Sequence, residues 1–147
     1  MATNCFNKRP ISLALQKLSI EHTYSNVKSC KIRNNVLTCI LYVTPSDVSD
    51  TYTVKIEYHF KYKPSAVLIA PELQLFNGKR PTHLYGNDNN GNPKLCVFCP
   101  MRIEWNSQMY LSKSFIPWIS TWLNTYEYWV ITGEWHYPES SHAVKKV

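Results

Sequence analysis

The sequence lacks the features that mark several large functional classes. Only four glycines occur, and they form no phosphate-binding loop, while no zincin helix and no Ser-His-Asp series is present either. No apolar run approaches the roughly 20 residues of a transmembrane helix, and the opening residues MATNCFNKRP lack the apolar core of a secretory signal peptide. We therefore expect a cytoplasmic protein that has no membrane partner.

The charged residues also lack the arrangement that nucleic acid requires. Sixteen Lys and Arg residues against ten Asp and Glu residues give a formal net charge of +6. The basic residues are scattered, however, and pair only at Lys8-Arg9, Lys79-Arg80 and Lys145-Lys146. No basic stripe interleaved with aromatic residues is present to follow a phosphate backbone. We expect no nucleic-acid partner, whereas an acidic protein surface would suit the same charge.

What the sequence does contain is enough apolar material for one folded domain over residues 1–147. Hydrophobic residues make up 44% of the chain and aromatic residues 14%, which excludes a disordered tail or a fibre. Five cysteines are an odd number, so at least one thiol stays outside any intramolecular disulfide. We expect Cys39 in the core of a strand, while Cys5 and Cys30 carry no signal.

Apolar residues recur at helical spacing in two segments. Residues 10–21 predict an amphipathic helix with Pro10 in its first turn. The residues expected on its buried face are Ile11, Ala14, Leu15 and Leu18. Residues 115–132 predict a second helix, which Ser114 would cap and which Gly133 would end in the left-handed conformation. The tryptophans expected to pack in the core are Trp105, Trp118, Trp122 and Trp129.

Between the helices the hydrophobic period changes to two, which predicts strands. Four such segments follow one another between residues 29 and 72 and predict an antiparallel meander. The third alternates most clearly, with an apolar face made by Tyr52, Val54, Ile56, Tyr58 and Phe60. A sheet with one apolar face needs a cover, which the two helices supply, so the predicted class is α+β. Residues 73–92 follow neither period and predict a long irregular loop.

The stretch HLYGNDNNGNPKLCVFCPMRIEW, from His83 to Trp105, contains the candidate chemistry. A loop rich in asparagine and glycine follows His83 and leads into an apolar run that carries Cys96 and Cys99. Such a loop offers a way to present a reactive thiol at the surface. Cysteine is intrinsically a good nucleophile, although only a few per cent of a thiol with a pKa of about 8.5 is ionised at neutral pH. A buried structural cysteine is the alternative.

Cys96 and Cys99 also form a Cys-x-x-Cys pair, which metal sites and redox proteins use. A structural zinc site needs four ligands, and no second paired motif exists. The histidines that only the tertiary fold could bring to such a site are His83, His136 and His142. A thioredoxin-like dithiol needs a helix after the pair, whereas Pro100 follows here. We therefore predict neither a metal nor another cofactor.

The order of these features resembles the ubiquitin-conjugating enzyme (UBC) family over nearly the whole chain. That family has a helix, a four-stranded meander, a His-Pro-Asn motif, a polar loop, a catalytic cysteine, a tryptophan and a further helix. His83, the loop GNDNNGNPK, Cys96 and Trp105 occur here in that order, with nine positions from cysteine to tryptophan. The resemblance implies that Cys96 forms a thioester with the C-terminus of a protein, and that His83 braces the loop beside it.

The sequence departs from the family motif directly after the histidine. Leu84 and Tyr85 stand where the family has proline and asparagine. The family asparagine supports the oxyanion of the attacked thioester, so this role has no assigned residue here. The residues that would substitute are Tyr85, Asn87 and Asn89. By the same resemblance Trp105 is a supporting residue, and Cys99 is either a supporting residue or the nucleophile of an alignment shifted by one turn.

The C-terminal part resembles a narrower group, the UBC-like proteins of short type II CBASS operons in bacterial anti-phage defence. The segment LNTYEYWVITGEWHYPESSH, with its Trp-x-x-Thr-Gly-Glu-Trp core from Trp129 to Trp135, carries this resemblance. It implies that Cys96 captures the C-terminus of a cGAS-like nucleotidyltransferase and then passes it to an amine or releases it. The alternative is a catalytically inert UBC-like module that binds a protein partner, which the missing asparagine favours.

Overall fold

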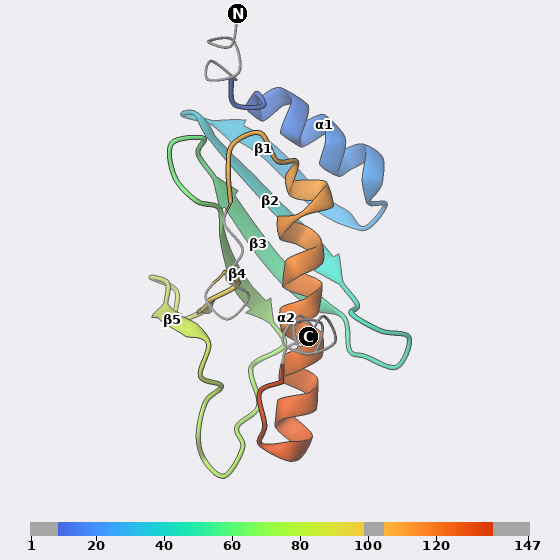
Figure 1. The fold of residues 1–147 in the computed structure, drawn as a ribbon, viewed down its shortest axis with the longest axis vertical. Coiled ribbons are helices and arrows are strands. Elements are labelled where there is room, and N and C mark those ends of the chain that lie inside the picture. Colours follow the sequence, from blue (N-terminus) through green and yellow to red (C-terminus); the bar gives the residue numbers. More distant parts are fainter. Residues whose placement is uncertain (1–8, 99–104, 137–147) are drawn as a thin grey trace, which may run out of the picture.

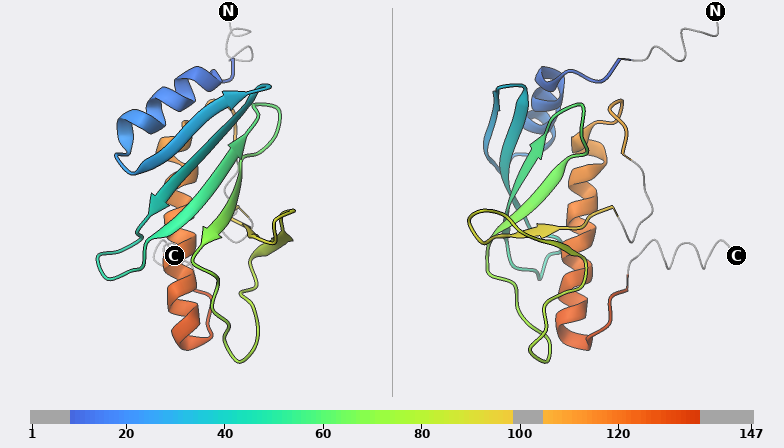
Figure 2. Two further views of the ribbon diagram at one scale, coloured as in Figure 1. Left: turned by 180° about the vertical axis from the view of Figure 1, so that it is seen from behind. Right: turned by 90° about the vertical axis from the view of Figure 1, so that its left-hand side faces the viewer.

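The computed structural model describes residues 9–98 and 105–136, which form an antiparallel sheet and two α-helices (Figure 1). The elements are α1 (Leu13–Thr23), β1 (Val27–Arg33), β2 (Val36–Val43), β3 (Tyr52–Tyr58), β4 (Ser65–Ala70), β5 (Leu84–Asn87), β6 (Pro93–Leu95), the 3-10 helix η2 (Leu111–Lys113) and α2 (Phe115–Thr132). The longer helix, α2, lies along one face of the sheet, and α1 lies beside its β1–β2 end (Figure 2). The α+β class predicted from the sequence is confirmed.

The sheet has six strands in the order β1-β2-β3-β4-β6-β5, and every neighbouring pair is antiparallel. The sequence predicted only four strands, followed by an irregular loop over residues 73–92. This prediction is wrong in the second half of that segment, because β5 lies inside it. β5 and β6 have only four and three residues. Strands this short show no readable alternation, and only their pairing in the tertiary structure identifies them.

Strand β3 has the one-sided apolar pattern that the sequence predicted. Tyr52, Val54, Ile56 and Tyr58 are at most 3% exposed, and they belong to the same buried core as the apolar side of α2. Phe60, which was expected on this face, is 41% exposed. It lies beyond the end of the strand at Tyr58, so the alternation no longer determines its side.

Helix α1 buries a different face from the one that its apolar residues predicted. Leu15 is 49% exposed and Leu18 60% exposed, whereas Gln16 and Ile20 are fully buried. The Gln16 Nε2 donates a hydrogen bond to the Met109 carbonyl oxygen at 2.8 Å, and its Oε1 accepts one from the Leu111 N–H at 2.9 Å. The amide therefore joins α1 to the start of η2, and this satisfied polar contact determines which face is buried.

The start of α1 also differs from the prediction. The helix begins at Leu13, and the Oγ of the N-cap Ser12 accepts a hydrogen bond from the Leu15 N–H at 3.1 Å. Pro10 therefore lies before the helix instead of in its first turn. The serine hydroxyl gives one unpaired N–H group of the first turn a hydrogen-bond acceptor. A proline in that turn supplies no acceptor and only lacks an N–H group that would need one.

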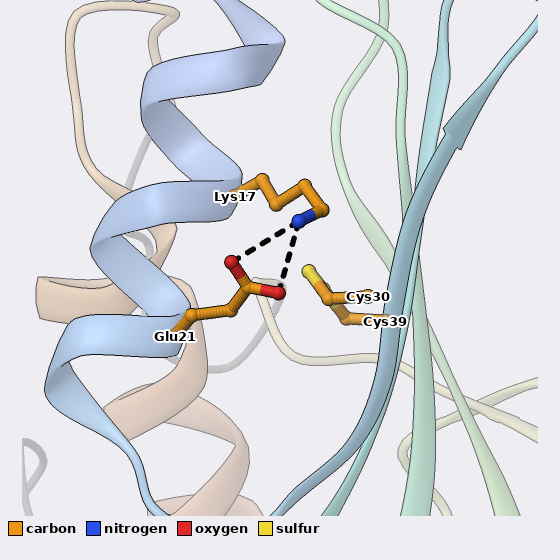
Figure 3. A network of polar contacts seen from close by, with 4 residues as sticks. All are labelled: Lys17, Glu21, Cys30 and Cys39. Carbon is orange, nitrogen blue, oxygen red and sulfur yellow. Dashed lines mark hydrogen bonds and ion pairs between the residues drawn. A yellow bond between two sulfur atoms is a disulfide. The ribbon is translucent and has the colours of Figure 1, made fainter.

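A disulfide joins Cys30 and Cys39, which are direct partners in the β1–β2 ladder. Figure 3 shows this bond near α1, where Lys17 and Glu21 form an ion pair at 3.0 Å one helical turn apart. Cys39 is fully buried, as predicted. The pairing with Cys30 was not predicted, because strand register brings the two residues together and the sequence does not show the register.

Helix α2 spans Phe115–Thr132 as predicted, and Gly133 follows in the left-handed conformation with φ 78°. Ser114 is the N-cap residue, but its Oγ donates to the Tyr110 carbonyl oxygen at 2.7 Å instead of capping α2. Trp122 and Trp129 are buried, while Trp105 and Trp118 are partly buried against the core. None of the helices in the described ranges is long and apolar enough to cross a membrane.

Candidate active site

The hairpin of β5 and β6 at the edge of the sheet brings His83 and Cys96 together. Leu84 in β5 pairs with Leu95 in β6. His83 directly precedes this pair and Cys96 directly follows it, so the two residues lie opposite each other where the hairpin meets the rest of the protein. β6 also pairs with β4, which attaches the hairpin to the sheet.

The polar loop after His83 is the turn of this hairpin, and Asp88 organises it. The Asp88 Oδ1 accepts hydrogen bonds from the N–H groups of Asn92 at 2.8 Å and Asn90 at 2.9 Å. The Asp88 N–H donates a hydrogen bond to the Asn92 carbonyl oxygen, and the Asp88 carbonyl oxygen accepts one from the Gly91 N–H. The N–H of Asn92, more than any other group, lowers the pKa of the Asp88 carboxyl. The Asn-rich sequence thus folds into a defined turn.

The carbonyl oxygen of His83 is the centre of the site's backbone geometry. It accepts a hydrogen bond from the Cys96 N–H at 3.0 Å and a second from the Trp122 Nε1 at 3.1 Å. Trp122 is fully buried in the middle of α2. One carbonyl group therefore ties the histidine, the cysteine and the long helix together, and it determines where the Cys96 backbone lies.

Cys96 itself is buried, with 5% of its surface exposed, so it is not the surface thiol that the preceding loop suggested. The reason lies in the residues that follow it. Phe98 stacks on Phe115 at a ring-centroid distance of 5.4 Å and lies edge-on to Trp118 at 6.0 Å. Val97 is 1% exposed. The apolar run after the loop enters the core and takes Cys96 with it.

The His83 ring packs against Trp135, with ring centroids 4.9 Å apart and an angle of 47° between the planes. Trp135 also lies edge-on to Trp122 at 5.1 Å. Burial lowers the pKa of His83 below its ordinary value, because removal from water disfavours the charged imidazolium. The neutral form of His83 is therefore favoured beside Cys96.

The three residues predicted to replace the family asparagine lie at different distances along the hairpin. Tyr85 directly follows the Leu84–Leu95 pair and is 58% exposed. Asn87 lies nearer the turn, where its Oδ1 accepts a hydrogen bond from an Arg80 amino group at 2.9 Å. Asn89 is exposed in the turn itself. By register, Tyr85 lies closest to Cys96 of the three.

The remaining predicted supporting residues do not join this group. Trp105 lies edge-on to Tyr58 of β3, with ring centroids 5.3 Å apart. Cys99 lies outside the described residues, as does His142. In the part of the chain that the structure describes, no three His, Cys, Asp or Glu residues gather where they could hold a metal ion.

A groove of about 500 Å³ runs beside the hairpin. Its lining residues include Glu72, Leu73, Leu75, Arg80, Asn87 and Pro93. The groove combines apolar side chains with one carboxylate and one guanidinium group. It shares Asn87 and Pro93 with the turn end of the hairpin, whose other end carries Cys96.

Sequence reasoning missed the roles of two aromatic residues at this site. Trp122 was expected only as a core residue, and Trp135 only as the end of the segment that resembles the CBASS proteins. The signal that could have identified Trp135 is its place in the Trp-Val-Ile-Thr-Gly-Glu-Trp segment, because a glycine after a helix reverses the chain and returns the next residues along it. No local pattern could have indicated that Trp122 reaches His83, which is 39 positions away.

A family model described as the type II CBASS E2 protein matches residues 16–143. The matched range includes α2, the β5–β6 hairpin, His83, Cys96 and Trp135. A search of curated proteins found no match.

Proposed function

The chain belongs to the type II CBASS E2 protein family, and from this premise we propose that Cys96 is the nucleophile of a UBC-like acyl transfer. Family membership confirms the resemblance to type II CBASS proteins and indicates a conjugation-type activity in anti-phage defence with a protein partner. The proposal adds the residue, the thioester intermediate and the partner. That partner is a cGAS-like nucleotidyltransferase, joined through its C-terminus.

The observation that carries this proposal is the hydrogen bond from the Cys96 N–H to the His83 carbonyl oxygen at 3.0 Å. It joins, across a hairpin, the two residues that the family motif separates by a polar loop. Trp122 of α2 donates a hydrogen bond to the same carbonyl. The backbone of Cys96 is therefore positioned by β5, β6 and α2 together. A nucleophile held in one geometry loses little freedom when it reacts.

The chemistry requires an acyl group that arrives in activated form, either as an acyl adenylate or as a thioester of another protein. The Cys96 thiolate attacks the acyl carbon, and the phosphate or thiolate leaving group departs with its bonding electrons while the thiol proton passes to solvent. An amine then attacks the new thioester, which releases the Cys96 thiol and forms an amide; water in place of the amine releases the free C-terminus. Neither step requires a metal or a bound cofactor.

The small exposed fraction of Cys96 adds a condition to the proposal. An acyl carbon reaches Sγ only if residues around it move apart, since the side chain is 5% exposed. We expect partner binding to provide this movement. Cys96 should therefore react slowly with small reagents and faster when the partner is present.

Mass spectrometry tests the proposal after the protein is incubated with the nucleotidyltransferase of its own operon, whose C-terminus is supplied as an activated thioester. We expect a covalent adduct that hydroxylamine or excess thiol cleaves, as thioesters require. Cys96→Ala should abolish it, and Cys96→Ser should replace it with an oxyester that resists thiol. Cys99→Ser is the matched control and should keep the adduct. An adduct that persists unchanged in Cys96→Ala would overturn the assignment of Cys96.

A catalytically inert binding module is the second candidate function. The burial of Cys96 favours it, as does the presence of Leu84 and Tyr85 where the family has proline and asparagine. In this case the partner would bind without covalent chemistry, and Cys96→Ser would leave both partner affinity and phage resistance unchanged. Loss of resistance with retained affinity would instead support the acyl transfer.

A further inference from the structure

We propose that Trp135 is a positioning residue of the candidate site. In this role it holds His83 in place and, through His83, the backbone of Cys96. The catalytic part of this inference rests on the proposed function, whereas the positioning part concerns the folded protein alone. It also gives a structural purpose to the segment after α2, which has no place in the acyl-transfer chemistry.

The chain reaches His83 by reversing at the end of α2. The Gly133 N–H donates to the Trp129 carbonyl oxygen at 2.7 Å, and Gly133 adopts φ 78°. The Thr132 Oγ1 donates to the Tyr128 carbonyl oxygen at 2.9 Å and accepts a hydrogen bond from the Glu134 N–H at 3.0 Å. Figure 1 shows the following residues running back alongside the helix. These three hydrogen bonds thus fix the direction in which Trp135 leaves the turn.

The surroundings of Gly133 disfavour any residue with a side chain at this reversal. A Cβ atom there would lie 2.5 Å from the Phe76 ring, and the positive φ is unfavourable for any residue with a side chain. Phe76 itself packs on Trp129 at 5.9 Å. The turn is therefore fixed by close packing as well as by hydrogen bonds.

After the turn, Trp135 contacts both His83 and Trp122. Its ring centroid lies 4.9 Å from that of the His83 imidazole and 5.1 Å from that of the Trp122 ring. The Trp122 Nε1 holds the carbonyl oxygen of the same histidine. The two indoles therefore fix His83 at its ring and at its backbone, and they brace each other.

The hairpin depends on this packing because it has little stability of its own. β5 and β6 contribute four and three residues, and a two-stranded hairpin of this size is marginal in water. Every residue of β5 is half-exposed or exposed. Loss of Trp135 would therefore free His83 before it affected the main core, and Cys96 would lose the carbonyl partner that positions it.

Nuclear magnetic resonance titration of His83 and alkylation of Cys96 test this role in the full chain without any partner. The variants are Trp135→Ala and Trp135→Phe. Ile20→Ala is the control, because it removes a buried side chain from α1, which packs on β1, β2 and η2 and not on the hairpin. His83→Gln identifies the histidine signal among the five in the chain.

In Trp135→Ala we expect the pKa of His83 to rise toward about 6.5, because water reaches the imidazole. Alkylation of Cys96 by iodoacetamide should be roughly threefold faster or more, since local opening of the hairpin exposes the thiol. Thioester formation with the partner should become slower, so the two rates change in opposite directions. Trp135→Phe keeps an aromatic ring and should show smaller changes of the same sign. This variant keeps the test informative even if Trp135→Ala does not fold.

Unchanged His83 pKa and Cys96 alkylation in both Trp135 variants would overturn the inference. Equal changes in Ile20→Ala would overturn it too, because they would reflect general destabilisation. Failure of the proposed function looks different: the wild-type protein would form no adduct, while the pKa and alkylation rates would still respond to Trp135. Conversely, adduct formation that is insensitive to Trp135 would leave the role of Cys96 intact.

Discussion

The two ends of the sheet are held together by different kinds of contact. At the β1–β2 end, a disulfide between Cys30 and Cys39 joins neighbouring strands, and the buried amide of Gln16 links α1 to η2. At the β5–β6 end, two indoles from α2 and from the segment after it hold a short hairpin through His83. The first end is held by a covalent bond between paired strand residues and by a fully buried amide, whereas the second depends on ring packing and one indole hydrogen bond.

This difference indicates where the protein can change shape. Backbone ladders and a disulfide keep the β1–β2 end in one geometry, whereas the hairpin end depends on ring packing at a partly exposed surface. Regions with few buried contacts open at low free energy, and functional elements are drawn from such regions. A site that must expose a buried cysteine to a protein partner is suited to the second end.

The largest expected effect is at the hairpin end. Trp122→Ala should lower the free energy of unfolding by about 3–5 kcal/mol, the usual result of removing a buried tryptophan ring. It also removes the Nε1 donor from His83. Urea denaturation measures the loss. Trp118→Ala, at a partly buried position on the same helix, is the matched control, and an equal loss there would contradict the central role of Trp122.

The disulfide tests whether the two ends are independent. Replacing both Cys30 and Cys39 by alanine should lower the free energy of unfolding by about 2–3 kcal/mol, from the entropy of the closed loop in the unfolded chain. Thermal unfolding with and without reductant provides the same comparison in the wild-type protein. The rate of Cys96 alkylation should stay unchanged under native conditions. A parallel change in that rate would show that the ends are coupled.

The amide of Gln16 tests the unexpected orientation of α1. Gln16→Leu should cost about 1–3 kcal/mol despite its greater hydrophobicity, because the Met109 carbonyl and the Leu111 N–H lose their partner. Lys17→Ala removes only an ion pair at the surface and should change stability by less than about 0.5 kcal/mol. Chemical denaturation of both variants measures the difference. Equal losses of stability in the two variants would mean that the Gln16 amide does not determine which face of α1 is buried.

The smallest expected effect is the pH dependence that His83 contributes. Because burial lowers the pKa of His83 in the folded protein, the unfolded state binds more protons as the pH falls through about 6.5. His83 therefore favours folding above that pH, and this contribution is lost below it. His83→Gln should reduce the fall in stability between neutral and mildly acidic pH. A steeper fall in the variant would contradict the direction of the shift.

Much of the fold could be predicted because it depends on local periodicity. The span of α2 and the buried side of β3 followed from spacings of about 3.6 and two residues. The buried face of α1 was predicted wrongly by the same reasoning, since Leu15 and Leu18 are apolar yet exposed. A hydrogen-bonded amide outweighed hydrophobicity there, and its partners lie more than 90 positions away.

The order of the candidate site residues along the chain was predictable, but their contacts in space were not. The order of His83, a polar turn and Cys96 could be read from the sequence, as could the end of a helix at Gly133. The fold was needed to show that Cys96 is buried, that Cys30 bonds to Cys39, and that two tryptophans hold the histidine. The physical reason is that register and ring packing depend on how distant segments dock together, and no spacing along the chain records that docking.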